Sequence, residues 1–364
     1  MLSEREAYLW LGSLRTMSSA AKQKLLMIFG APGEIFGLSE DILMHLVTEQ
    51  VIKAETMEEI HATRKEEQLK RKIEEYLAKN APFVTPADPE YPELLLEIPD
   101  PPAALFYRGD IRLMAKRPAV AVVGSRTPTM YGREMARLFV PPLASAGVVI
   151  VSGLAAGIDA DAHGEALSAG KTIGVLGGGI DICYPLNNYR IYDEMCKNHL
   201  VITEYPPGTA PLSMNFPQRN RIISGISEGI LVVEARDRSG TRITADAALD
   251  QGRNVYAIPG RVGDPLSEGT NTLIRMGAML VRRPEDILED LGLTEKNRGR
   301  RKKREQKLTR DEEMILSRLS FTPVYVDDLL PSEPAELQRT FALLLSMEQR
   351  GLVRQVMQGY YVKT

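Results

Sequence analysis

The chain has 364 residues, 44% of them hydrophobic and 26% charged, and a formal net charge of −3. This length allows two or three globular domains, and the slightly acidic balance means that any contact with phosphate must come from local basic patches. No apolar run approaches the ~20 residues of a membrane-spanning helix, and Met1–Trp10 does not resemble a secretory signal. We therefore expect a cytoplasmic protein without a membrane span. The two cysteines predict neither a disulfide framework nor a zinc site.

Residues 1–79 are predicted to form an all-α domain. Large apolar residues recur here at spacings of three and four, as on the buried stripe of a helix. Between Leu25 and Phe36, one helix is expected to stop at Gly30-Ala31-Pro32-Gly33 and a short second helix to follow. The pattern resembles a helix-hairpin-helix of a SAM-like domain. A helical hairpin that serves packing alone is the alternative.

Residues 80–293 are predicted to form an α/β domain with a Rossmann-like, doubly wound, mostly parallel sheet. The proline-rich stretch from Asn80 to Gly109 is expected to be an extended, turn-rich lead-in. After it, short β-branched runs alternate with helical stretches, which indicates a parallel sheet covered on both faces. A last helix is expected from Pro284. The expected strands are Ala119–Val123, Val148–Val151, Thr172–Leu176, Leu200–Thr203, Ile230–Glu234 and Val255–Ile258.

The C-terminal part is predicted to be a linker and a small third domain. Residues 294–307 are rich in lysine and arginine and form either a solvated tether or a non-specific phosphate contact. In residues 308–364, three helices and a β-hairpin suggest a winged-helix domain. Its third helix is not strongly basic, which favours contact with protein. The helices are expected at Asp311–Leu319, Val326–Leu330 and Glu336–Gln349, and the hairpin at Leu352–Tyr361.

Functional residues of an open α/β sheet are expected where strands end and helices begin. Four such segments are unusual: Gly124-Ser125-Arg126, Ser152–Asp159, Gly177-Gly178-Gly179 and Asn215–Arg221. Glycines and helix N-termini allow close approach to an anion, and an arginine offers a fork for phosphate. The last segment adds an aromatic ring and amides, which suits unpaired bases and their backbone. Together the four segments predict a cradle for single-stranded nucleic acid.

Other chemistries fit the sequence less well. The chain has neither a GxxxxGKS/T phosphate loop nor an intact GxGxxG dinucleotide motif, so no cofactor is predicted. Asp159, Asp161 and His163 do not share one helix face, so no metal site is predicted either. No Ser-His-Asp triad can be assigned. Glu204 and Glu234 end two strands, which leaves carboxylate-based hydrolysis as the rival.

Longer motifs extend along the chain: Tyr91–Leu95, Pro101-Pro102, Tyr107–Gly109, Gly124–Arg126, Ser152–Asp159, Glu204–Pro206, Phe216–Gly225, Val232–Ala235 and Ala257–Gly260. With these motifs the chain resembles the DNA-processing protein A (DprA, or Smf) family over nearly its full length. The resemblance implies a non-catalytic protein that binds incoming single-stranded DNA during natural transformation and protects it. It also implies that the protein displaces single-strand-binding protein, loads the RecA recombinase and forms a homodimer.

The same resemblance implies a set of DNA-binding residues and no catalytic ones. Where the family usually has Lys-Ser-Gly-Ser, this chain has Arg238–Thr241, which preserves the charge. The implied set is Gly124, Ser125, Arg126, Ser152, Gly153, Asn215, Phe216, Arg219, Asn220, Arg221, Arg238 and Thr241.

Two alternatives to DNA binding follow from the same region. The rival enzyme is a phosphoribohydrolase of the related lysine-decarboxylase-like fold, whose motif is PGGxGTxxE. Here no Pro-Gly-Gly precedes Gly240-Thr241, and Thr244 stands where the catalytic glutamate belongs. The third alternative is an adaptor that acts through the winged helix.

Overall fold

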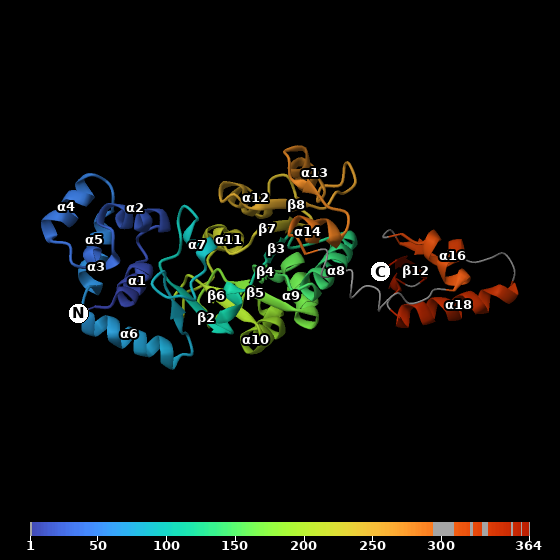
Figure 1. Cartoon of the computed structure of the whole chain (residues 1–364), viewed down its shortest axis with the longest axis horizontal. Helices are drawn as coiled ribbons and strands as arrows, with labels where there is room; N and C mark the ends of the chain where they lie inside the picture. Colours follow the sequence, from blue (N-terminus) through green and yellow to red (C-terminus); the bar gives the residue numbers. More distant parts are fainter. Residues whose placement is uncertain are drawn as a thin grey trace.

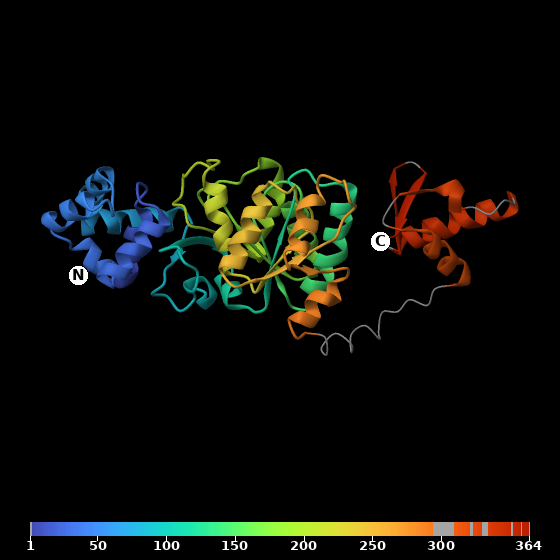
Figure 2. The same ribbon diagram turned by 90° about the horizontal axis from the view of Figure 1, so that it is seen from above.

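The computed structural model describes residues 2–293, 309–320, 323–329, 334–350, 352–357 and 359–363. Three regions follow one another along its longest axis: the N-terminal helices, a sheet domain and a smaller C-terminal module (Figures 1 and 2). The predicted basic linker at 294–307 lies outside the described residues. Over the part of the chain that is described, no helix is long and apolar enough to cross a membrane.

The N-terminal helices surround a core of their own that includes Trp10, Leu25 and Ile60. Serine side chains cap three of these helices by accepting hydrogen bonds from backbone N–H groups. The second helix ends at Gly30, whose φ of 82° turns the chain sharply into the third. The helices are α1 Glu4–Ser13, α2 Ser19–Phe29, α3 Pro32–Phe36, α4 Glu40–Thr48, α5 Ala54–Thr63 and α6 Glu66–Ala78.

A nine-stranded sheet forms the centre of the molecule in the order β1-β2-β6-β5-β4-β3-β7-β8-β9. The seven strands β3 to β9 run parallel to one another, and β2 runs antiparallel to both of its neighbours, β1 and β6. The mostly parallel α/β sheet predicted from the sequence is confirmed. The strands are β1 Phe83–Val84, β2 Leu105–Gly109, β3 Ala119–Val123, β4 Val149–Ser152, β5 Lys171–Val175, β6 Leu200–Thr203, β7 Gly229–Val232, β8 Asn254–Ala257 and β9 Met279–Leu280.

Helices cover both faces of this sheet (Figure 1). Alternate residues of β3 enter two different cores, Val120 and Val122 on one face and Ala121 and Val123 on the other. A strand that is buried on both faces needs apolar residues at every position, which explains the unbroken Ala119–Val123 run. One face carries α8 Met130–Ser145, α9 Ile158–Ala169, α10 Tyr189–Asn198 and α14 Pro284–Asp290; the other carries α7 Glu93–Leu96, α11 Asn215–Gly225, α12 Gly240–Asp250 and α13 Glu268–Arg275.

The proline-rich segment differs from the sequence prediction. We expected only an extended lead-in from Asn80 to Gly109, but β1 and β2 of the sheet lie within it, and η1 Ile111–Ala115 follows. The prolines are tolerated because β1 is a two-residue edge strand and its partner β2 begins after Pro101 and Pro102. The other edge strand, β9, was also missed. Its two residues are exposed and carry no alternation of polar and apolar positions.

The C-terminal module packs around Leu316, Leu344 and Val353. Its three strands pair in the order β10-β12-β11, so a short strand between the first two helices joins the expected hairpin. The elements are α16 Arg310–Arg318, β10 Val324–Tyr325, α17 Val326–Leu329, α18 Pro334–Gln349, β11 Val353–Met357 and β12 Tyr360–Lys363.

Candidate functional site

A pocket opens at the carboxyl ends of β3 and β7, and we call it the crevice pocket. The strands that follow β3 in the chain lie on one side of it, towards β6, and the strands that follow β7 lie on the other side, towards β9. The loops after the neighbouring strands β3 and β7 therefore lead in opposite directions. Such a reversal of strand order leaves a crevice in which open α/β sheets bind ligands. The cavity measures about 540 Å³. Its polar and aromatic lining includes Ser125, Arg126, Asp159, Tyr184, Ser213, Phe216, Arg219, Asn220, Arg236, Ser239, Thr241 and Thr244.

The loop after β3 carries the exposed Arg126. The backbone carbonyl of Ser125 accepts a hydrogen bond from the Ile158 N–H at 3.1 Å, which locks this loop against the start of α9. Gly157 permits the approach because its φ is 80° and a Cβ there would lie 2.3 Å from that carbonyl oxygen. The Arg126 guanidinium lies over the ring of Phe216, with Cζ 5.3 Å from the ring centroid. No carboxylate of a described residue forms an ion pair with it.

Phe216 lies in the first turn of α11 and is half-buried. Asn215 fixes this turn, since its side-chain amide donates to the carbonyl of Gly177 at 3.0 Å. Gly177 also makes room for the ring, because a Cβ there would lie 2.8 Å from Phe216 Cδ1. Of these residues, only Phe216 lines the pocket. Asn215 and the Gly177 loop therefore position the ring.

Arg219 forms the floor of the pocket and is only 2% exposed. Its Nη1 donates to the carbonyls of Gly153 and Val175, which joins α11 to the ends of β4 and β5. Burial lowers the pKa of Arg219 to about 10, against the opposing effect of the Asp159 carboxylate. Burial likewise raises the pKa of Asp159, which accepts from the Gly153 N–H at 3.1 Å. Arg219 thus contributes positive charge from a fixed position.

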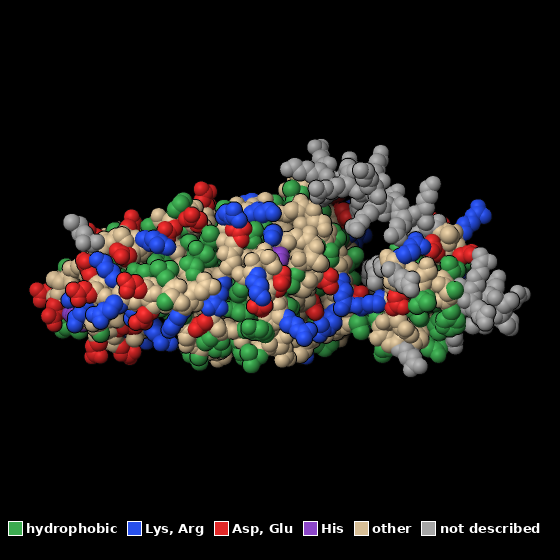
Figure 3. Space-filling view, turned by 90° about the horizontal axis from the view of Figure 1, so that it is seen from below, with side chains coloured by type: hydrophobic (Ala, Val, Ile, Leu, Met, Phe, Trp, Pro, Cys, Tyr) green, Lys and Arg blue, Asp and Glu red, His purple; other side chains and the backbone are tan. Residues whose placement is uncertain are grey.

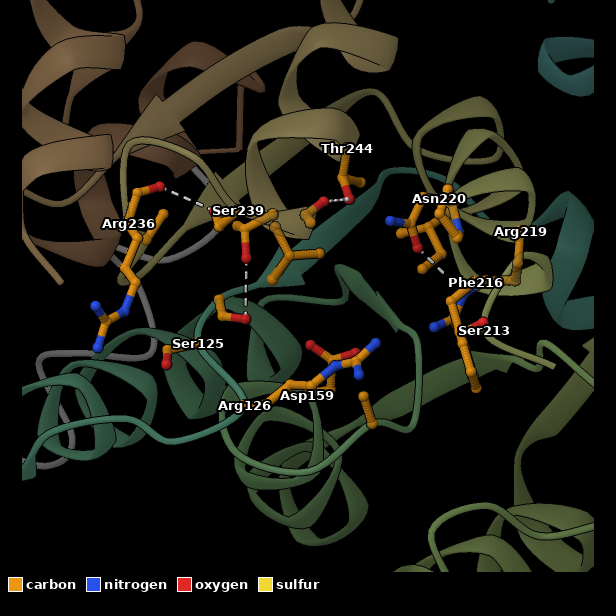
Figure 4. Close-up of a pocket in the computed structure, with 18 of the residues that line it drawn as sticks. Ser125, Arg126, Asp159, Ser213, Phe216, Arg219, Asn220, Arg236, Ser239 and Thr244 are labelled. Atoms are coloured by element: carbon orange, nitrogen blue, oxygen red, sulfur yellow. Dashed lines mark hydrogen bonds between the residues drawn. The ribbon is translucent and has the colours of Figure 1, made fainter. Parts of the chain in front are cut away.

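The opposite wall is the N-terminus of α12. The Ser239 hydroxyl caps this helix by accepting from the Arg242 N–H, and the Thr241 hydroxyl donates to the Gly124 carbonyl at 3.1 Å. Free N–H groups at a helix start favour an anion. In Figure 4, Arg126 and Asp159 lie across the pocket from Thr244, with Phe216, Arg219 and Asn220 at one end and Arg236 at the other.

The structure sorts the twelve predicted DNA contacts into three groups. Gly124, Ser125, Arg126, Phe216, Arg219, Asn220 and Thr241 line the crevice pocket. Ser152, Gly153 and Asn215 are buried behind it, and a Cβ at Gly153 would lie 2.5 Å from the Arg219 guanidinium. Arg238 is exposed beside the lining residues Arg236 and Ser239, and Arg221 does not reach the pocket.

Arg221 belongs instead to a buried group that we call the interdomain charge cluster, made of Ser19, Lys22, Asp100, Glu204 and Arg221. The guanidinium lies 2.7 Å from Glu204 Oε1 and 2.9 Å from Asp100 Oδ2, and it donates to the Ser19 hydroxyl. Burial alone would lower the pKa of Arg221, but the two carboxylates hold it above its usual value. The cluster joins α2 of the N-terminal helices to the sheet domain.

Sequence reasoning missed several lining residues. Tyr184 follows β5 in the chain, and its ring centroid lies 5.7 Å from that of Phe216. Arg236 follows β7, and Asp159 opens α9. Their positions in the sequence could have predicted these residues, since each lies within a few residues of a strand end or a helix start. Asp159 falls within the predicted cradle segment Ser152–Asp159, but as a single residue it was considered only as a metal ligand and was not among the predicted DNA contacts.

The rival carboxylates are both engaged elsewhere. Glu204 lies in the interdomain charge cluster. Glu234 is 1% exposed and accepts from the N–H and hydroxyl of Thr129, and burial raises its pKa. Neither lines the crevice pocket, and Thr244 does. The pocket is therefore built of cations, an aromatic pair and helix N-termini rather than of paired acids.

Charges of both signs are mixed over the surface. On the face shown in Figure 3, acidic and basic side chains lie side by side over the N-terminal helices, and lysines and arginines are also spread across the sheet domain. This explains how a chain with a net charge of −3 still presents local basic surface.

Comparisons with known proteins agree on one family. The model for DNA recombination-mediator protein A matches residues 82–292. The DNA processing protein DprA of Bacillus subtilis is 40% identical over 255 residues, which are 70% of this chain and 85% of that protein. Protein Smf of Escherichia coli is 48% identical over 209 residues, which are 57% of this chain and 56% of that protein.

Two solved structures resemble the fold. DprA of Streptococcus pneumoniae matches with a TM-score of 0.60 and 42% identity, over 64% of this chain and 80% of that one. DprA of Helicobacter pylori, described as binding single-stranded DNA in a unique mode, matches with a TM-score of 0.53 and 30% identity. That match covers 57% of this chain and 95% of the Helicobacter chain.

Proposed function

The chain belongs to the DNA recombination-mediator protein A family, and we propose that its crevice pocket binds single-stranded DNA. The family consists of mediators rather than enzymes, so the proposal contains no catalytic step. One observation carries it: an exposed arginine, with no carboxylate partner among the described residues, lies over a half-buried aromatic ring in an open crevice. A guanidinium contacts phosphate and an aromatic face stacks on an unpaired base.

We assign different roles to the residues around the pocket. Arg126, Phe216, Asn220 and the Ser239–Thr241 turn are proposed to contact DNA directly. Gly153 and Asn215 are proposed to act through Arg219 and Phe216, because both are buried, the Gly153 carbonyl accepts from Arg219, and the Asn215 amide fixes the first turn of α11. Ser152 is proposed to fix the end of β4 against β3, because its buried hydroxyl donates to the Val122 carbonyl. Arg238 is proposed as a peripheral phosphate contact. Arg221 is left out, since its guanidinium is committed to two carboxylates.

The wider biological role is also a proposal. We propose that the protein protects incoming DNA, displaces single-strand-binding protein and loads RecA during natural transformation, as a cytoplasmic homodimer. Family membership and the position of the pocket support these steps. We further propose that residues 308–364 form a winged helix that contacts protein. The adaptor alternative would place the whole function there, but it leaves the crevice pocket unexplained.

The rival phosphoribohydrolase is not favoured. Its chemistry needs a carboxylate where Thr244 lines the pocket. Asp159, the acid that does line it, is packed beside Arg219 and bonded to backbone N–H groups. A carboxylate held in this way fixes a loop and is poorly placed to activate water.

A salt titration tests the DNA-binding proposal. The logarithm of the affinity for a single-stranded oligonucleotide should fall linearly with the logarithm of the salt concentration, and duplex of the same length should bind more weakly. Arg126→Ala should lower single-strand affinity roughly tenfold at low salt and reduce the salt slope by about one, because one phosphate contact is lost. Mononucleotide turnover is followed in the same samples.

Arg112→Ala is the matched control. Arg112 is exposed, bonded to Asp110 and placed before β3, at the sheet edge opposite the pocket. It should leave affinity and salt slope unchanged. Wild-type affinity in Arg126→Ala, or turnover of a mononucleotide, would contradict the proposal.

A further inference from the structure

Large apolar side chains are exposed along two loops at the carboxyl edge of the sheet, beside the crevice pocket. The segment between β5 and α10 contributes Tyr184 and Leu186, and the first residue of α10 is Tyr189; they are 51%, 76% and 55% exposed. The loop between β6 and α11 contributes Leu212 and Met214, which are 51% and 64% exposed. Exposed apolar surface gathered at one place marks a binding surface more often than chance exposure.

Tyr184 differs from the other tyrosines of its segment. Tyr192 is buried, and its hydroxyl donates to the Ile180 carbonyl at 2.6 Å, so it has a structural role. Tyr189 is exposed but packs against Tyr192 and does not line the pocket. Tyr184 lines the pocket, and its hydroxyl bonds to no described residue. Its ring is therefore available to a ligand.

The geometry of Tyr184 and Phe216 fixes how bases can use them. Their ring centroids are 5.7 Å apart and their planes are tilted by 34°, which is a contact pair. No base fits between two rings that already touch. The guanidinium groups of Arg126 and Arg219 both lie over the Phe216 ring, with Cζ 5.3 and 5.9 Å from its centroid, so a base that stacks on Phe216 must displace the exposed Arg126 and lie beside it. A second base must use the exposed surface of Tyr184.

We propose that Tyr184 is a second stacking platform and that the crevice pocket holds two successive bases of a single strand, one on Phe216 and the next on Tyr184. This inference rests on the proposed function and adds a residue and a stoichiometry to it. Stacking on aromatic side chains tolerates any base, so the second platform adds affinity without adding sequence preference.

Oligonucleotides with abasic positions test the stoichiometry. One ligand carries a single thymine in an otherwise abasic strand, and the other carries two adjacent thymines in the same strand. Wild-type protein should bind the second ligand roughly 5- to 100-fold more tightly, as expected for one further stacked base. Tyr184→Ala should abolish this gain, and Tyr184→Phe should retain it because the ring face remains.

Tyr189→Ala is the control, since it removes an equally exposed tyrosine of the same segment that does not line the pocket. It should show the wild-type gain. If Tyr184→Ala keeps the full gain while Arg126→Ala loses affinity for both ligands, the second platform is refuted and the DNA site stands. If wild-type protein binds neither ligand and no other single strand, the proposed function fails and this inference fails with it.

Discussion

Helix α11 borders two regions with opposite properties, the crevice pocket and the interdomain charge cluster. At the pocket, Arg126 of the loop after β3 is exposed and lies over Phe216 of α11, and no carboxylate of a described residue forms an ion pair with it. In the cluster, Arg221 of α11 is buried with its side chain 9% exposed and is paired with Glu204 and Asp100. Similar guanidinium groups are therefore available to bind a ligand in one region and stabilise the fold in the other.

The difference lies in what each charge interacts with. A buried charge needs a partner, so Arg221 is matched by carboxylates from two other segments. An exposed cation in a crevice needs none, because water solvates it until an anion replaces the water. Substitutions in the cluster should therefore change stability, and substitutions at the pocket should change DNA affinity.

Arg221→Ala should give the largest effect on stability. Removing the guanidinium takes the ion-pair partner from both Glu204 and Asp100, which should lower the free energy of unfolding by about 3 to 5 kcal/mol. Urea denaturation measures this change. The control Arg112→Ala removes an exposed ion pair and should not alter the urea midpoint. If the two variants unfold at the same urea concentration, the contrast between the regions is wrong.

Lys22 should make the cluster sensitive to alkaline pH. Burial lowers the pKa of Lys22 from 10.5 to about 8, and the lysine donates to the Gly12 carbonyl at 2.9 Å. Between these two values the unfolded chain binds a proton that the folded chain has released. Stability contributed by this residue therefore rises as the pH increases from about 8 to 10.5, by about 3 kcal/mol.

Lys22→Met isolates this contribution, because it keeps the length and apolar character of the side chain and removes the titration. The difference in unfolding free energy between wild type and variant is measured at several pH values. It should shift in favour of the wild type as the pH rises from 8 to 10.5. A constant difference would mean that Lys22 titrates in the folded protein as it does in the unfolded chain.

Much of the sheet domain could be predicted from the sequence because buried parallel strands leave a strong local pattern. The run Ala119–Val123 is apolar at every position, and the structure places β3 at these residues. The edge strands were missed for the opposite reason. Strands β1 and β9 have two residues each, which is too short for any periodicity.

The roles of Arg219 and Arg221 show what the sequence pattern could not separate. Both belong to the segment Asn215–Arg221 and were predicted to contact DNA. In a helix, residues two apart point in different directions, so only one of them can face the pocket. The ion-pair partners of Arg221 determine that it is the arginine that faces away from the pocket, and one of them, Asp100, is 121 residues away along the chain. Such a pairing depends on the tertiary structure and leaves no local sequence pattern.

Phe216→Ala tests most directly whether the crevice pocket holds unpaired bases. The measurement compares the affinities of wild type and variant for single-stranded and duplex oligonucleotides of equal length at one salt concentration. Loss of one stacked base should weaken single-strand binding by about 1 to 3 kcal/mol and leave duplex binding unchanged. Equal losses for both ligands, or no loss for the single strand, would contradict the assignment of this pocket as the single-strand site.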